Sequence, residues 1–220
     1  MIRCCIFDLD GVVVDTARFH FEAWASLALD LGFRLTAQAA EATKGVGRME
    51  SLDIVLRAGG LEGRFSPEEK QRLADEKNAR YLAFAAHMTP ADVLPGVGAF
   101  LEELRHCGVK RALGSASKNA GAILDRCDLR RRFDAVVDGT QVSKAKPDHE
   151  VFLKGAEALG MNPAVCVVFE DAAAGIEAAA RAGMRSVGVG AGAPLGRASM
   201  RIASFEGFTF EKLCREIDDI

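Results

Sequence analysis

Near its N-terminus the chain reads Arg3-Cys4-Cys5-Ile6-Phe7-Asp8-Leu9-Asp10-Gly11, a short apolar run that ends in two aspartates. A run of this kind is typical of a buried strand that leads into a loop. Similar segments recur later in the chain, at Val109–Gly114, Asp134–Asp138, Ala164–Phe169 and Ser186–Gly190. Helical patterns separate these segments. Strands that alternate with helices of about ten residues predict an α/β fold with a doubly wound parallel sheet, covered by helices on both faces.

The stretch between the first two strands, roughly residues 16–90, contains helical patterns and no convincing strand. Apolar residues recur at helical spacing as far as Gly32, and a second helix is expected over Met49–Ala58. A third helix begins after Ser66, which we expect to be its N-cap, and continues to about Ala86.

An insert of this length is too long for a loop. We therefore expect two domains, an α/β core formed by residues 1–15 and 91–220, and an all-helical cap formed by residues 16–90. Beyond Gly190 the pattern predicts a possible strand and a helix over Phe210–Ile217, without visible chemistry.

Composition excludes several classes of partner. Lys and Arg number 28 against 31 Asp and Glu, so the net charge of −3 indicates no binding of nucleic acid or of an anionic membrane. No apolar run approaches the ~18 residues that span a bilayer, and the N-terminus does not resemble a signal peptide, so we expect a cytoplasmic protein. The six cysteines show no C-x-x-C spacing and are predicted to be reduced core thiols.

Polar residues follow the predicted strands at the edge of the sheet where doubly wound folds bind ligands. Asp8 and Asp10 follow the first strand, and two-residue spacing places both on one side of an extended chain. The later strands are followed by Ser115–Asn119, by Lys146, and by Glu170 with Asp171.

Four carboxylates at one sheet edge repel one another unless a cation compensates them. No His or Cys lies beside them in the sequence, so oxygen ligation of Mg²⁺ is favoured over zinc. Such a site leaves one carboxylate free as a nucleophile and another as a proton carrier. Lys146, with a serine hydroxyl or backbone N–H at 115–116, could hold phosphate oxygens.

Each motif alone has an ordinary structural explanation. A D-x-D pair occurs in many surface turns, and Ser115–Asn119 could simply begin a helix. Lys146-Pro147 could be a solvated loop, and Glu170-Asp171 could be acids favoured at a helix N-terminus. Their order at successive strand ends favours catalysis over these alternatives.

The order of D-x-D-G, Ser, Lys-Pro and Glu-Asp resembles the haloacid dehalogenase superfamily of phosphotransferases, whose core is Rossmann-like, across essentially the whole chain. Within it, further segments are similar to the β-phosphoglucomutase family. These segments are Asp15-Thr16-Ala17, His20-Phe21, Ala23-Trp24, Lys44-Gly45-Val46, Arg48, Ser51-Leu52, Lys77-Asn78 and Ser115–Asn119.

The resemblance implies roles for the core residues. Asp8 would be phosphorylated, and Asp10 would be the general acid and base for the sugar hydroxyl. Asp8, the Asp10 carbonyl and Asp171 would bind Mg²⁺, with Glu170 close by. The transferring phosphoryl group would be held by Ser115, the Ala116 N–H and Lys146.

The resemblance also implies roles for the cap. Arg48, with Ser117, Lys118 and Asn119 of the core, would bind the other phosphate of a bisphosphorylated sugar. Thr16, His20 and Lys77 would link cap closure to the placement of Asp10. Further substrate contacts would come from Trp24, Gly45, Val46 and Ser51. The alternatives are that Trp24 is cap core, that His20 is structural and that Lys77 is solvated.

The implied activity is interconversion of β-D-glucose 1-phosphate and β-D-glucose 6-phosphate through phospho-Asp8 and the 1,6-bisphosphate. A Mg²⁺-dependent sugar-phosphate phosphatase and, from a different class, a non-catalytic sugar-phosphate binder are the alternatives. Two positions depart from the family pattern, Gly47 and Ala172, where serine is frequent. A monomer would suffice for this mechanism.

Overall fold

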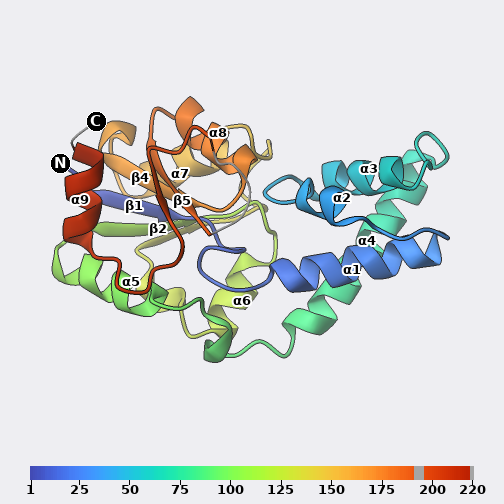
Figure 1. Ribbon diagram of the computed structural model, residues 1–220, viewed down its shortest axis with the longest axis horizontal. Helices are drawn as coiled ribbons and strands as arrows, with labels where there is room; N and C mark the ends of the chain where they lie inside the picture. Colours follow the sequence, from blue (N-terminus) through green and yellow to red (C-terminus); the bar gives the residue numbers. More distant parts are fainter. Residues whose placement is uncertain (191–195, 219–220) are drawn as a thin grey trace. The chain divides into compact units, whose positions relative to one another are not determined.

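The computed structural model describes residues 1–190 and 196–218. The chain forms two compact units (Figure 1). The core unit comprises Met1–Asp15 and Thr89–Ile220, and the cap unit comprises Thr16–Met88.

The core unit is built on a parallel sheet, which has six strands in the described part of the chain, in the order β3-β2-β1-β4-β5-β6. The strands are β1 (Cys4–Phe7), β2 (Lys110–Gly114), β3 (Ala135–Val137), β4 (Cys166–Glu170), β5 (Arg185–Val189) and β6 (Met200–Ile202). The direction of strand order reverses between β1 and β4, and doubly wound sheets bind ligands at that switch point. The predicted doubly wound α/β fold is confirmed.

The helices of the core unit follow the strands as the apolar patterns predict. They are α5 (Val97–His106), α6 (Ala120–Arg126), α7 (Glu150–Ala158), α8 (Ala173–Arg181) and α9 (Phe210–Asp218), with 3-10 turns at Pro90–Asp92, Arg130–Arg132 and Pro163–Val165. Helix α8 ends just before Gly183, which has a φ of 70°. Glycine adopts this left-handed conformation without strain and therefore ends helices well.

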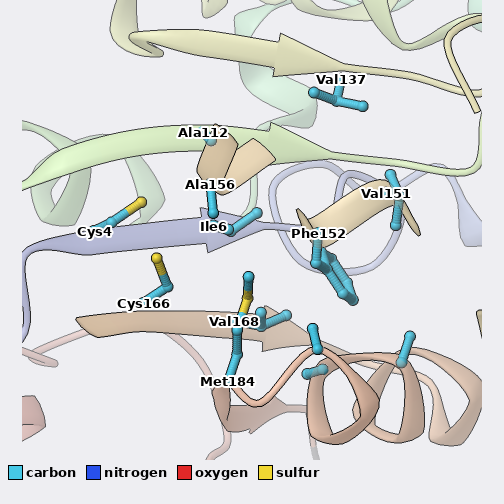
Figure 2. Close-up of a cluster of buried hydrophobic side chains, with 13 residues drawn as sticks. Cys4, Ile6, Ala112, Val137, Val151, Phe152, Ala156, Cys166, Val168 and Met184 are labelled. Atoms are coloured by element: carbon cyan, nitrogen blue, oxygen red, sulfur yellow. The ribbon is translucent and has the colours of Figure 1, made fainter. Parts of the chain in front are cut away.

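Alternation along β1 sends its side chains to two different packed layers. On one face, Ile6 packs with Ala112 of β2 and with Phe152 and Ala156 of α7, while Val168 of β4 continues the same layer (Figure 2). Each fully buried Ile, Val or Phe side chain in this layer contributes about 1.5–3 kcal/mol to folding.

The opposite face of the sheet is covered by a cluster of aromatic rings. Phe7 of β1 stacks on Phe169 of β4 with ring centroids 4.8 Å apart. Phe100 of α5 meets Phe169 edge-on at 5.5 Å, and Phe205 and Phe208 complete the cluster. Such ring pairs contribute about 0.5–1.5 kcal/mol each beyond their burial. The two layers together fix the carboxyl ends of β1 and β4 side by side.

The cap unit consists of α1 (Ala17–Asp30), α2 (Ala37–Glu41), α3 (Arg48–Ala58) and α4 (Pro67–Ala85) in its described residues. Ser66 caps α4, as predicted, in a capping box with Glu69. The short helix α2 was not predicted. The cap has its own apolar cluster, in which Trp24 and Leu27 of α1 pack against Leu52 and Val55 of α3.

The six cysteines lie in described segments and all are free thiols. The prediction that they are core thiols is wrong for Cys107, which is exposed because it follows the last turn of α5 at the surface. In residues 1–190 and 196–218, no helix has the length and apolar character needed to cross a membrane.

Candidate active site

The strand register brings the predicted core residues to one edge of the sheet. Phe7 of β1 pairs with Phe169 of β4, so Asp8 and Glu170 occupy equivalent positions on neighbouring strands. The Asp8 N–H donates to the Phe169 carbonyl at 2.9 Å, which extends the pairing to Asp8. On the other side, Ser115 follows β2 and donates its N–H to Val137 of β3 at 3.0 Å.

Lys146 bridges two of the carboxylates. Its ammonium Nζ donates to Asp8 Oδ1 at 2.5 Å and to Glu170 Oε2 at 2.8 Å, and its side chain is fully buried. Burial alone lowers the pKa of Lys146, but the carboxylates of Asp8 and Glu170 outweigh this effect and the pKa is raised. Lys146 is therefore a fixed positive charge beside Asp8, and the solvated-loop alternative is wrong.

Three carboxylates meet beside this ammonium. Asp8, Glu170 and Asp171 each offer an oxygen, and these oxygens lie within 4.8 Å of one another. Burial raises the pKa of Glu170 to about 8, Lys146 opposes this shift, and the charges of Asp8 and Asp171 add to it. One ammonium therefore does not balance the negative charge. An all-oxygen set short of positive charge fits a hard divalent cation such as Mg²⁺.

The backbone around Asp8 turns tightly after the strand. The Asp10 N–H donates to Asp8 Oδ2 at 3.1 Å, and the Gly11 N–H donates to the Val14 carbonyl at 2.9 Å. The Asp10 contact fixes one carboxylate oxygen of Asp8, while Lys146 holds the other.

The loop after β2 is ordered by its own hydroxyl groups. Ser115 is buried, and its Oγ accepts the Ser117 N–H at 3.1 Å. The Ser117 Oγ in turn accepts the N–H of Asn119 at 3.2 Å. Asn119 is the N-cap residue of α6, so this loop also serves as the helix start that we gave as its alternative role. Ala116 and Lys118 lie in the same loop.

Glu150 was not predicted, although it fixes the loop that carries Lys146. Its Oε2 accepts the Ser143 N–H and the Lys144 N–H, each at 2.8 Å, and Oε1 lies 2.8 Å from Lys154 Nζ. The Lys154 ammonium and the backbone N–H of Lys144 lower the pKa of Glu150 to about 2. Its position in the first turn of the helix after Lys146-Pro147 was the only signal in the sequence.

The cap unit contains a second buried cation. Lys77 is only 4% exposed, and its Nζ lies 2.8 Å from His20 Nδ1 and 4.6 Å from the centroid of the Trp24 ring. Burial, together with the charges of Lys77 and Arg48, holds the pKa of His20 well below its usual range. The solvated alternative for Lys77 is therefore wrong. Trp24 is part of the cap core, as its alternative proposed.

Most of the remaining cap residues lie around the start of α3. Arg48 begins this helix, and its guanidinium donates to Asn78 Oδ1 at 2.8 Å. The Ser51 hydroxyl is buried and donates to the Thr43 carbonyl at 3.3 Å. Gly45, which precedes Val46, has a φ of 70°. Thr16 is buried and lies just before α1. The roles of all these residues in binding substrate stay predictions.

Comparison with known proteins decides the family. The model of the haloacid dehalogenase-like hydrolase family matches residues 2–183. The chain belongs to this family. The resemblance seen in the sequence is confirmed.

Three relatives narrow the position within the haloacid dehalogenase-like family. The chain is 41% identical to a beta-phosphoglucomutase of Bacillus subtilis, over 98% of this chain and 95% of the relative. It is 36% identical to a phosphorylated carbohydrates phosphatase of Thermotoga maritima, over 84% of each. Among solved structures, a beta-phosphoglucomutase from Clostridium difficile matches with a TM-score of 0.93 and 39% identity, covering 100% of this chain and 98% of the other.

Proposed function

We propose that the protein interconverts β-D-glucose 1-phosphate and β-D-glucose 6-phosphate, the activity of a β-phosphoglucomutase. The observation that carries the proposal is the 41% identity with the Bacillus subtilis mutase, which runs through 98% of the chain and so includes the cap. The match to the Thermotoga maritima phosphatase is lower in identity and covers 84% of the chain.

In the proposed reaction, the phosphoryl group carried by Asp8 passes to the 6-hydroxyl of β-D-glucose 1-phosphate. Asp10 accepts the proton of that hydroxyl, and the product is the 1,6-bisphosphate. After the bisphosphate has turned round, Asp8 attacks the 1-phosphate and Asp10 returns the proton to the leaving oxygen. Asp8 is phosphorylated again, and β-D-glucose 6-phosphate leaves.

The geometry supports Asp8 as the attacking group. Lys146 and the Asp10 N–H hold its two carboxylate oxygens, so the side chain is oriented before the substrate arrives. Lys146 and Ser115 would hold the equatorial oxygens of the transferring phosphoryl group. The buried charge of Lys146 acts strongly there because water is excluded from it.

We propose Mg²⁺ as the cation of the site, held by Asp8, the Asp10 carbonyl and Asp171, with Glu170 beside them. The support is the cluster of oxygens within 4.8 Å and the deficit of positive charge. When bound, Mg²⁺ offsets the charge on the phosphoryl oxygens during transfer.

A mutase has two requirements that a phosphatase lacks. It must protect phospho-Asp8 from water, and it must bind a phosphate at each end of the sugar. For the second phosphate we propose Arg48 of the cap and the polar loop Ser117–Asn119 of the core. We further propose that the enzyme acts as a cytoplasmic monomer.

The product assay separates the mutase from the phosphatase. The enzyme, with Mg²⁺ and a trace of β-glucose 1,6-bisphosphate, is given β-D-glucose 1-phosphate and followed by phosphorus NMR. We expect glucose 6-phosphate as the main product; inorganic phosphate as the main product would refute the mutase.

Two variants test the role of Asp8. Asp8→Asn should abolish turnover with the fold intact, whereas Asp128→Asn should not, because Asp128 is exposed and its left-handed φ of 53° suits asparagine. Turnover retained by Asp8→Asn would remove Asp8 from its role.

A further inference from the structure

Gly175 lies in the first turn of α8, directly over the end of β4. A Cβ atom placed on Gly175 would lie 2.0 Å from Glu170 Cδ, 2.2 Å from its Oε2 and 2.4 Å from its Cγ. Contacts this short do not occur between real side chains, so the Glu170 side chain occupies the space that any other residue at position 175 would fill.

The Glu170 side chain is held where it lies. It is completely buried, and both carboxylate oxygens are engaged. Oε1 accepts the Ala172 N–H at 3.2 Å, and Oε2 accepts from Lys146 Nζ at 2.8 Å. Because the same ammonium holds Asp8 Oδ1, a displaced Glu170 would also displace the cation that orients Asp8.

Asp171 likewise occupies the space that a side chain at Gly11 would fill. A Cβ atom on Gly11 would lie 2.3 Å from Asp171 Oδ2 and 2.8 Å from its Cγ. Gly11 also has a φ of 78°, so a side chain there would strain the backbone whatever its contacts. Gly175 is helical and has no such restriction. Substitution at Gly175 therefore isolates the effect of the missing Cβ.

We propose that Gly175 is a positioning residue for the metal and phosphoryl site: its missing Cβ leaves the space in which the Glu170 carboxylate is held against Lys146. The inference rests on the proposed metal site of this enzyme and not on the identity of its sugar.

Alanine is normally favoured over glycine inside a helix. At Gly175 this gain is opposed by the collision with Glu170. Gly155 of α7 provides a matched control, because its added Cβ would meet Ile6 at 3.5 Å, an ordinary packing distance. Any general effect of an alanine in a buried helix should appear equally in the Gly155→Ala variant.

The test is a cycle of Gly175→Ala, Glu170→Ala and the double variant, with Gly155→Ala as the control. Mg²⁺ affinity is measured by calorimetry on the metal-free enzyme, and the thermal unfolding midpoint is measured without metal. Gly175→Ala should weaken Mg²⁺ binding about 10- to 100-fold, as loss of a supporting contact does at metal sites. Gly155→Ala should bind Mg²⁺ like the wild type.

Truncating Glu170 to alanine removes the three nearest atoms that the new Cβ would meet. In the Glu170→Ala variant, Gly175→Ala should therefore leave Mg²⁺ affinity unchanged and raise the unfolding midpoint, whereas it lowers the midpoint in the wild type. If Gly175→Ala does not fold, the comparison of Glu170→Ala with the double variant still tests the inference.

Wild-type affinity in Gly175→Ala would overturn the inference. So would a lowered midpoint on adding Gly175→Ala to the Glu170→Ala variant, because the substitution would then act through the helix alone. If the wild type itself binds no Mg²⁺, the proposed metal site fails and the inference fails with it. Phosphatase activity in the product assay would leave the inference intact.

Discussion

Replacing Lys146 with methionine removes the ammonium that bridges Asp8 and Glu170. Methionine keeps most of the length of the side chain and an apolar stem, so the change is mainly one of charge. The lysine is fully buried, with contacts of 2.5 Å to Asp8 Oδ1 and 2.8 Å to Glu170 Oε2. Breaking a buried ion pair by removing one partner costs about 3–5 kcal/mol, because the other charge stays buried without compensation.

We therefore expect the free energy of unfolding to fall by about 3–5 kcal/mol in the Lys146→Met variant without divalent metal. The assay is urea unfolding followed by circular dichroism, with EDTA present. The urea midpoint should fall with an unchanged slope, since the unfolded state exposes the same surface. Saturating Mg²⁺ should reduce the loss, because the cation restores positive charge near the same carboxylates.

Lys144→Met is the matched control from the same loop. The Lys144 side chain is 71% exposed, and its ammonium lies 3.7 Å from Asp148. An exposed ion pair contributes only about 0–1 kcal/mol. If Lys146→Met were no more destabilising than Lys144→Met, the view of Lys146 as the charge that holds the site together would be refuted. Above about pH 8, where Glu170 is otherwise ionised, a further variant, Lys146→Met with Glu170→Gln, should recover part of the loss because one carboxylate becomes neutral.

Three further predictions concern pH, helix capping and the cap. Without metal, the free energy of unfolding should fall as pH rises from about 5 to about 8, because the folded state keeps the proton of Glu170 up to a pKa of about 8 while the unfolded state loses it near 4.5. Urea unfolding over this range should show a smaller fall in the Glu170→Gln variant. An equal fall in the wild type and the variant would contradict the prediction. Ala172 and Gly47 are the N-cap residues of α8 and α3, and neither supplies a capping side chain. Ala172→Ser should stabilise the protein by about 1 kcal/mol and Gly47→Ser by about a few tenths of a kcal/mol. Both are measured by thermal unfolding, and a lowered midpoint would be the contrary result. Arg48→Ala should weaken binding of the 1,6-bisphosphate or increase the fraction of phosphate released. The control is Arg57→Ala, which changes an exposed arginine on the same helix. If Arg48→Ala had the same kinetics as this control, Arg48 would not bind the second phosphate.

The core fold and the core of the site could be predicted because both depend on short-range patterns. A buried strand of four or five residues gives an apolar run, and the carboxyl ends of parallel strands meet at one edge. Asp8, Lys146 and Glu170 could therefore be brought together from their positions alone. The observed strand order, and the match to a solved structure with a TM-score of 0.93, confirm the predicted sheet.

Features that depend on packing in three dimensions could not be predicted. Lys77 lies in a helix rich in charged residues and reads as solvated, yet Trp24 and Tyr81 enclose its ammonium. Glu150 acts through the conformation of the loop before it. The space at Gly175 follows from the distance between a helix and a strand end, which no local pattern specifies. Helix α2 has too few residues for a periodic pattern.

The central claim is that Asp8 passes its phosphoryl group to a sugar and not to water. It is tested most directly with enzyme phosphorylated by radiolabelled β-glucose 1,6-bisphosphate, freed of excess donor and mixed with unlabelled β-D-glucose 1-phosphate in a rapid-quench instrument. We predict that the label is on Asp8 before mixing and moves into sugar phosphate far faster than it is released as inorganic phosphate. Label on another residue, or label recovered mainly as inorganic phosphate when the sugar is present, would contradict the account.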